Sequence, residues 1–422
     1  MPTVKPIVYP LGFPKRFLWG ASISAHQVEG GLHNQWTVWE LENAKSLATQ
    51  APYIYSDLDN WPDIKKLAET PANYISGKAV HHKELYAKDF DLLEQLHMNA
   101  FRFSIEWSRL EPEEGVWNAE AVAYYRDYFA ELERRGIEPI VTLFHFTLPV
   151  WFADMGGFER RANIKYFVRY CEKVLELFGH DFKYVITVNE PEVYAFESYQ
   201  QGHWPPQKTK LSRALRVYKN LAVAHNRAAT MLHAAGRKYK VSIAKNMSFD
   251  YPGDDAKLTV WASVLSGWGK DTYWIKKVKK QCDFLGVNYY FSNRYYGYRI
   301  HNPNERVSDL GWDMQPYNIQ HVLEYAHERY GLPIMITENG LSDAKDKDRQ
   351  WWITQTVFGM QRAMKNGVEL IGYMHWSLLD NFEWDKGRWP RFGLATVDYR
   401  TMERTLRPSA LWFGRLIKKI RG

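Results

Sequence analysis

The chain has 422 residues, of which 45% are hydrophobic and 24% are charged, so it can fill a large core and is not a disordered protein. No Pro-, Gly- or Ser-rich stretch and no repeat of about 20–50 residues divides it, which predicts one domain over residues 1–422. The start of the chain lacks the pattern of a signal peptide, and no apolar run reaches the roughly 18 residues of a transmembrane helix.

The formal net charge of +7 makes the chain mildly basic. A basic cluster near the C-terminus permits a patch for nucleic acid or an anionic membrane, but the solvated face of a last helix is the favoured interpretation. Cys171 and Cys282 lie in apolar segments without metal-ligand spacing, which predicts a reducing, cytoplasmic environment. The basic cluster consists of Arg404, Arg407, Arg415, Lys418, Lys419 and Arg421.

Apolar strand-like segments and amphipathic helix-like segments alternate about eight times, which is typical of an α/β protein of the (β/α)8 TIM-barrel class with extended βα loops around the site. Segment 31–83 interrupts this order, because its aromatic residues lie among Asn, Asp and Pro without a sustained period. We expect it to be a long loop on the rim of the site. The predicted strands are 100–104, 139–145, 183–190, 240–244, 283–290, 332–340 and 370–376, with a first strand and its loop in 13–30, and the predicted helices are 84–96, 120–135, 163–178, 211–237, 317–330 and 346–366.

Two of the predicted strands end in a glutamate: Lys183-Tyr-Val-Ile-Thr-Val-Asn-Glu190-Pro and Leu332-Pro-Ile-Met-Ile-Thr-Glu338-Asn-Gly340. Either glutamate alone could be an ordinary residue at a strand–loop boundary. Two of them at the carboxyl ends of parallel barrel strands would face one shared mouth, where such barrels carry their active sites. Cleavage of a glycosidic bond needs this pair of carboxyl groups, one on each side of the sugar.

Thr187-Val-Asn-Glu190-Pro and Ile336-Thr-Glu338-Asn-Gly resemble the acid/base and nucleophile motifs of family 1 glycoside hydrolases, the β-glucosidase family. Similarity continues from about Phe13 to Trp412. The resemblance implies a retaining, exo-acting β-glycosidase that hydrolyses unphosphorylated β-D-glycosides through a covalent glycosyl-enzyme on Glu338, with Glu190 as acid/base. It implies no metal and no organic cofactor.

Further roles follow from the resemblance. Arg102 would pair with Glu338, and Tyr290, within the matching Asn288-x-Tyr290 segment, would donate a hydrogen bond that favours the anionic form of Glu338. Trp376 would supply a stacking platform for the sugar ring, and Trp389 would help Phe392 to close the site. The predicted sugar-binding residues are Gln27, His145, Asn189, Trp376, Glu383, Trp384 and Phe392.

The chain departs from the family pattern at His145-Phe146-Thr147, where Trp and Asp are expected after His, so this wall of the sugar pocket differs. The segment after Glu338 looks short, which would open the outer part of the site. Glu383-Trp384 argues against phosphorylated glycosides, whose enzymes carry Ser and a Lys/Tyr cradle there. Glu190 argues against a thioglucosidase, which has Gln at that position.

Two other functional classes were weighed. A sugar-binding barrel without catalysis is disfavoured because both carboxylates are present. A peripheral membrane glycosidase that acts on alkyl glycosides stays open and is compatible with the basic excess. We expect a small-molecule β-glycoside as the partner and no nucleic acid, whereas the glycone, the aglycone, homo-oligomerisation and membrane contact are left open.

Overall fold

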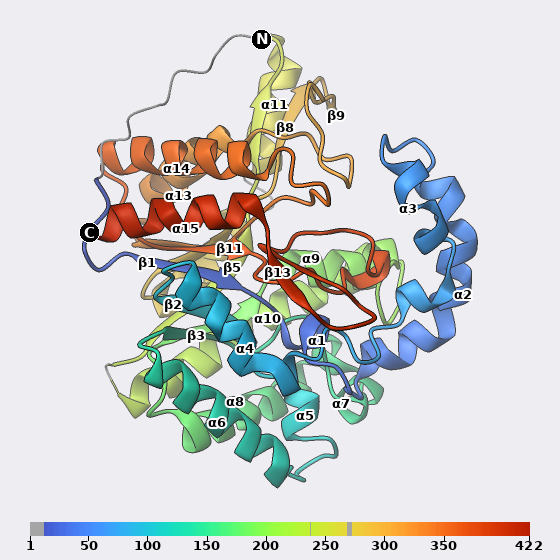
Figure 1. Cartoon of the computed structure of the whole chain (residues 1–422), viewed down its shortest axis with the longest axis vertical. Coiled ribbons are helices and arrows are strands. Elements are labelled where there is room, and N and C mark those ends of the chain that lie inside the picture. The colour runs from blue at the N-terminus through green and yellow to red at the C-terminus, as the bar shows by residue number, and fades with distance from the viewer. Residues whose placement is uncertain (1–11, 237, 268–271) are drawn as a thin grey trace.

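Eight parallel strands close into a barrel in the computed structural model, which describes residues 12–236, 238–267 and 272–422 (Figure 1). Neighbouring strands follow the order β1-β11-β10-β7-β5-β4-β3-β2, so the chain winds once around the barrel. This confirms the predicted (β/α)8 fold. The barrel strands are β1 (Leu18–Ser22), β2 (Ala100–Ser104), β3 (Glu138–Thr142), β4 (Tyr184–Asn189), β5 (Lys240–Asn246), β7 (Leu285–Asn288), β10 (Ile334–Asn339) and β11 (Leu370–Trp376).

The barrel strands are apolar because both of their faces are covered. Inside the barrel, side chains from seven strand segments form one buried cluster, and helices pack on the outside. This packing leaves only the carboxyl ends of the strands free to carry polar side chains toward a common centre. The interior cluster consists of Ala100, Ile140, Ile186, Ala244, Phe284, Met335 and Met374.

The outer helices follow from apolar residues at helical spacing. In α8 (Ile164–Phe178), for example, the buried residues recur every three or four positions and face the barrel. The other long helices around the barrel are α4 (His82–Gln95), α6 (Ala119–Arg134), α10 (Leu211–Ala235), α13 (Ile319–Tyr330), α14 (Arg349–Lys365) and α15 (Pro408–Arg421). All of these except α15, for which the sequence pattern set no bounds, lie within a few residues of their predicted positions. The prediction of one domain over 1–422 stays a prediction, since residues 1–11 lie outside the described part.

The segment 31–83, which we expected to be a long loop, is largely helical. The segment contains α2 (Gln35–Tyr55), α3 (Trp61–Ala68) and a short 3-10 helix, Pro71–Tyr74, on the right of Figure 1. Asn34 begins α2 with a capping box: its side chain accepts from the Thr37 amide at 3.0 Å, and the Thr37 hydroxyl accepts from the Asn34 amide at 3.0 Å.

Two loops at the carboxyl end of the barrel carry additional structure. The loop after β5 contains β6 (Phe249–Pro252) and α11 (Lys257–Gly267), and the segment after β7 contains β8 (Ser292–Tyr296) and β9 (Arg299–Ile300). β6, β8 and β9 form a small sheet, on which α11 packs. Within the described ranges, none of the helices has the length and apolar character that crossing a bilayer requires.

Candidate active site

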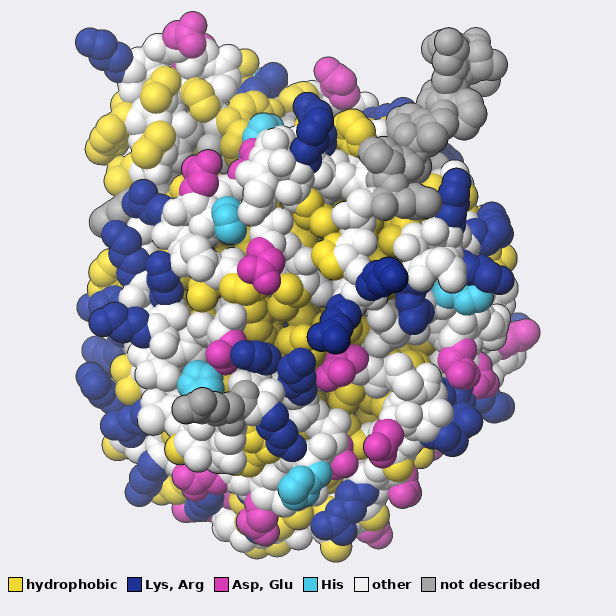
Figure 2. Space-filling model, turned by 90° about the vertical axis from the view of Figure 1, so that its left-hand side faces the viewer, with side chains coloured by type: hydrophobic (Ala, Val, Ile, Leu, Met, Phe, Trp, Pro, Cys, Tyr) yellow, Lys and Arg dark blue, Asp and Glu magenta, His cyan; other side chains and the backbone are white. Residues whose placement is uncertain are grey.

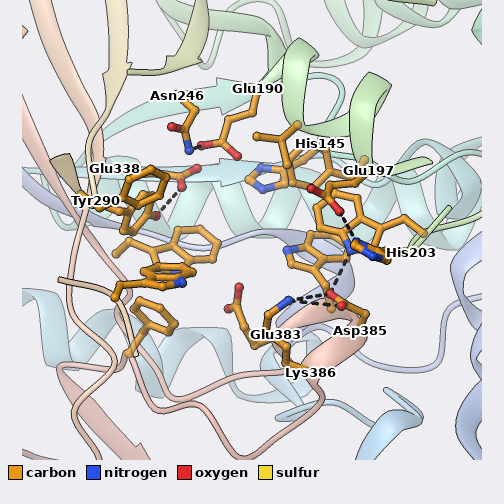
Figure 3. A pocket seen from close by; sticks show the side chains of 18 residues that line it. His145, Glu190, Glu197, His203, Asn246, Tyr290, Glu338, Glu383, Asp385 and Lys386 are labelled. Carbon is orange, nitrogen blue, oxygen red and sulfur yellow. Dashed lines mark hydrogen bonds and ion pairs between the residues drawn. The ribbon is translucent and has the colours of Figure 1, made fainter. Parts of the chain in front are cut away.

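A cavity of about 340 Å³ opens where the barrel strands end, and eight of the predicted site residues line it (Figure 3). Both strand-end glutamates reach it, as does Glu383 from the loop after β11. The two glutamates therefore share one site, as their positions in the sequence predict. The predicted lining residues are His145, Glu190, Tyr290, Glu338, Trp376, Glu383, Trp384 and Phe392.

Glu338, near the end of β10, is buried and fully paired. Arg102 from β2 donates to its Oε1 at 2.5 Å, and the Tyr290 hydroxyl donates to its Oε2 at 2.6 Å. Arg102 is itself fixed, because its second terminal nitrogen donates to Asn189 Oδ1 at 2.7 Å. A cation and a hydroxyl on opposite oxygens stabilise the anionic carboxylate, which is the form a nucleophile needs.

Glu190 follows β4 directly and has a left-handed backbone, with φ of 38°. It is buried, yet its partners are neutral: Asn288 Nδ2 and Asn246 Nδ2 donate to its Oε1 at 2.9 and 3.0 Å. Burial, and then the charges of Glu338 and Glu192, raise its pKa to about 8, although the two amides oppose the shift. Glu190 therefore holds a proton at neutral pH, as a general acid must.

A second carboxylate lies behind Glu190. Glu192 Oε1 accepts from the Asn246 backbone amide at 2.8 Å and from Lys245 Nζ at 3.0 Å. The same Asn246 thus contacts Glu192 through its backbone and Glu190 through its side chain. Our sequence analysis missed Asn246, although it ends β5 and the strand-end rule that found Glu190 also applies to it.

His145 lies between the indoles of Trp376 and Trp384, with interplanar angles of 19° and 16°. Burial and the nearby Arg102 charge lower its pKa well below the ordinary value, so the ring is neutral. Its Nε2 accepts from Asn189 Nδ2 at 3.2 Å, which places the proton on Nδ1, and this atom lacks a hydrogen-bond partner among the described residues. His145 is therefore a donor without an internal acceptor.

Gln27 and Asn189 do not line the cavity. The Gln27 amide donates to the Phe382 carbonyl at 2.8 Å and to Glu383 Oε2 at 3.3 Å, and it is fully buried. Asn189 likewise connects Arg102 to His145 from beneath the site. The structure thus gives both residues contacts that position lining residues, and their predicted direct contact with a sugar stays a prediction.

Glu383 faces the two catalytic candidates across the cavity (Figure 3). Burial raises its pKa to about 8; Lys386 opposes this, whereas Asp385 and Glu338 add to it. Lys386 pairs with Asp385 at 3.1 Å, and Asp385 also accepts from the Trp204 indole at 2.9 Å. The polar groups near Glu383 are thus linked to one another.

The outer wall was largely missed from the sequence. It includes a His203–Glu197 pair at 2.8 Å, together with Asp385 and Lys386, and these residues come from loops whose path the sequence pattern does not specify. The prediction that Trp389 helps to close the site is wrong: it is buried against Tyr55 of α2 and does not line the cavity. The lining residues that we did not predict for the site are Phe146, Val193, Glu197, His203, Trp204, Asn246, Phe291, Trp312, Asp385 and Lys386.

No three His, Cys, Asp or Glu side chains converge as metal ligands in the part of the chain that the structure describes.

Known proteins resemble the chain over nearly its whole length. The model of glycosyl hydrolase family 1 matches residues 10–264 and 270–421. A solved structure, a β-glycosidase from Pyrococcus horikoshii, is similar with a TM-score of 0.85 and 35% identity, over 98% of this chain and 96% of that one. Beta-glucosidase A of Acetivibrio thermocellus is 26% identical over 96% of this chain and 98% of its own length. The chloroplastic galactolipid galactosyltransferase SFR2 of Arabidopsis thaliana is 30% identical, over 78% of this chain and 57% of its own.

Proposed function

The chain belongs to glycosyl hydrolase family 1 and is a β-glycosidase, and we propose that it removes terminal sugars from unphosphorylated β-D-glycosides with retention of configuration. The observation that carries the proposal is the contrast between the two carboxyl groups. Glu338 has Arg102 and the Tyr290 hydroxyl as partners, whereas Glu190 has only neutral amides and a pKa of about 8. One group is prepared to attack and the other to give a proton.

In the first step, Glu338 attacks the anomeric carbon while Glu190 transfers its proton to the oxygen of the leaving aglycone. The bond from carbon to aglycone breaks and a glycosyl ester on Glu338 forms. In the second step, the Glu190 carboxylate takes a proton from water, and the resulting hydroxide oxygen displaces Glu338. Both groups return to their starting charge. Two displacements at one carbon restore the β configuration.

The walls of the cavity support an unphosphorylated sugar as the substrate. Trp376 and Trp384 offer aromatic faces, which suit the C–H faces of a pyranose. Lys386 is a cation that lines the cavity, but it is already paired with Asp385, and Glu383 lies beside it. The phosphate of a phosphorylated sugar would therefore meet carboxyl groups and would find no unpaired positive charge among the described lining residues. The small size of the cavity supports exo action, because it suits the end of a saccharide better than an internal segment.

Transfer of the glycosyl group to an alcohol is a second reaction of the same intermediate. In place of water, an acceptor hydroxyl gives its proton to Glu190 and its oxygen displaces Glu338, which yields a new β-glycoside. The name of the galactolipid galactosyltransferase relative supports transfer as a chemistry compatible with this fold. The cytoplasmic location stays a prediction; both cysteines are free and buried.

The proposal is tested by the dependence of two variants on the leaving group. Glu338→Ala should lose at least about 10³-fold in rate for every substrate, since the covalent step is gone. Glu190→Ala should lose about 10²–10⁴-fold on alkyl β-glucosides but keep fast glycosylation by a 2,4-dinitrophenyl β-glucoside. Azide should then enter the vacated space and release a β-glycosyl azide.

The opposite pattern would overturn the assignment. The proposed roles would be excluded if azide restored the activity of Glu338→Ala and gave a β-glycosyl azide. They would also be excluded if both variants depended on the leaving group in the same way. The configuration of the first-formed sugar, read by NMR with the unsubstituted enzyme, tests retention independently of either variant. An α-anomer as the initial product would rule out a two-step mechanism.

A further inference from the structure

Helix α11 presents apolar side chains to solvent, which is the reverse of the usual arrangement in a globular protein. Leu258, Trp261, Val264 and Leu265 are 55%, 63%, 67% and 43% exposed. Their spacing of three, four and seven residues places them on one side of the helix, away from the sheet on which α11 packs. The β8–β9 turn adds Tyr298, which is 74% exposed. We name these five residues the α11 face.

The α11 face forms one continuous surface with a neighbouring groove. The upper-left projection in Figure 2 carries a dense group of hydrophobic side chains, and α11 with β8 and β9 lies at the top of Figure 1. Beside it, a groove of about 490 Å³ is lined mainly by apolar and aromatic side chains. An exposed apolar area of this kind marks an interaction site. The groove residues include Phe196, Tyr218, Trp261, Leu265, Tyr273 and Tyr298.

Cationic side chains border this surface and lie against its tyrosines. Lys277 lies 4.7 Å from the ring centre of Tyr273, Arg299 lies 5.8 Å from that of Tyr298, and Arg294 lies 5.4 Å from that of Tyr296. Exposed Lys219 and Lys257 add positive charge, while exposed Asp254 and Asp255 precede the helix. Apolar and aromatic side chains with a Lys/Arg border match the headgroup region of an anionic bilayer.

The same loops reach the catalytic cavity. Phe291, which lines the cavity, directly precedes β8, and Asn246, which binds Glu190, ends the strand that leads to α11. Phe196 lines the groove and its neighbour Glu197 lines the cavity. A bilayer on the α11 face would therefore lie beside the loops that form the mouth of the site.

The basic C-terminus is less suited to this role. Arg404 and Arg407 are paired with Asp89 and Asp380 at 2.7 and 2.9 Å. The remaining cations lie on the exposed side of α15, whose apolar side is buried against the barrel, as the interpretation of a solvated helix face predicts. That helix offers charge with a single exposed large apolar side chain, Leu411, whereas α11 presents several.

We propose that the α11 face docks this protein on the surface of an anionic lipid bilayer. The test is co-sedimentation with vesicles of phosphatidylcholine alone and of phosphatidylcholine with about a third phosphatidylglycerol. We expect binding to the anionic vesicles at least about tenfold stronger than to the neutral ones, and weaker binding at high salt. The double variant Trp261→Ser/Val264→Ser should lose at least about tenfold in binding to anionic vesicles.

A matched control is Leu41→Ser/Ile54→Ser, which removes two similarly exposed apolar side chains (70% and 55%) from α2 and should bind vesicles as the parent does. Both double variants should keep the parent kcat/KM on a soluble aryl β-glucoside, which shows that they fold. The proposal is overturned if the parent does not sediment with anionic vesicles, or if both double variants lose binding equally. It is also overturned if sedimentation velocity shows a dimer that only Trp261→Ser/Val264→Ser dissociates, because a second copy then covers the face.

Discussion

The alkaline limb of the pH–rate profile should depend on the leaving group. Burial, and then the charges of Glu338 and Glu192, raise the pKa of Glu190 from 4.5 to about 8. At pH 7 a carboxyl group with a pKa of about 8 is about 90% protonated, whereas a pKa of 4.5 leaves about 0.3%. The site therefore increases the acid form of Glu190 about 300-fold, and this advantage disappears as the pH rises through about 8.

For an alkyl β-glucoside, whose alkoxide needs a proton to depart, kcat/KM should fall tenfold per pH unit above about pH 8, because it follows ionisations of the free enzyme. For a 2,4-dinitrophenyl β-glucoside no proton is needed, so the limb that arises from Glu190 should be absent. Glu383 also has a pKa of about 8, but its ionisation would act on both substrates alike. Comparing the two substrates separates the two groups.

The assay is initial rates for both substrates over about pH 5 to 10, with Glu190→Gln as the control. This variant should lose the limb that arises from Glu190 for the alkyl substrate, together with most of the activity, and its alkaline profile with the dinitrophenyl substrate should match that of the parent. Equal alkaline limbs for the two substrates in the parent enzyme would refute Glu190 as the acid. They would assign the limb to Glu383 or to another group that both substrates meet.

Three further outcomes are expected. Tyr290→Phe removes the 2.6 Å hydrogen bond to Glu338 and should lower kcat/KM about 10- to 150-fold, the range for a bond to a charged group; initial rates equal to the parent's would contradict this. Glu383→Ser should weaken transition-state binding of unphosphorylated glycosides by about 1–3 kcal/mol, and unchanged kinetics across a panel of glycosides would place Glu383 outside the sugar contacts. Glu190→Gln should raise the melting temperature, and the gain should grow as the pH rises from about 4.5 to about 8. Between these pH values the carboxyl group of Glu190 ionises in the unfolded parent protein but keeps its proton in the folded one, so the parent loses stability and the glutamine variant does not. A gain in melting temperature that shrinks over this interval would be evidence against the raised pKa.

The barrel could be predicted because its strands and most of its helices have strong apolar patterns. α2 could not, since after Trp36 and Trp39 its inward side is formed by the small residues Ala44, Ala48 and Ala51, which give little contrast with the polar residues around them. Pro52 within the helix weakened the pattern further, because proline lacks the N–H that an interior helical residue donates. The capping pair Asn34 and Thr37 was the readable signal, and we did not use it.

The candidate site could be predicted to the extent that its residues lie at strand ends. Glu190 and Glu338 lie at the ends of barrel strands, and so does Asn246, which could have been predicted by applying the same criterion to β5. Glu197 and His203 depend instead on how a loop returns over the barrel, which no local periodicity records. The pKa of Glu190 was predictable in direction only, because its size depends on burial and on neighbours from other strands.

The orientation of the two glutamates depends on irregular strand ends that no alternating pattern contains. Met335 points into the barrel, so simple alternation would also turn Thr337 and Asn339 inward and Glu338 outward. The pairing register shifts between Ile336 and Glu338, however, as it does in β4 between Ile186 and Asn189. Such a bulge changes the direction of the following side chains.

Because of this shift, Glu338 meets Arg102 inside the barrel while the Asn339 side chain turns outward and accepts from the Trp352 indole of α14 at 3.2 Å. In β4 the shift turns the Asn189 side chain inward, where it accepts a hydrogen bond from the same Arg102. Glu190 follows in a left-handed backbone conformation, and none of the hydrogen bonds described for Arg102 goes to it. One buried arginine thus pairs with Glu338 and leaves Glu190 to neutral amides. The difference in partners between two glutamates at similar strand ends therefore comes from where the two strands break their register, and not from the residues beside each glutamate in the chain.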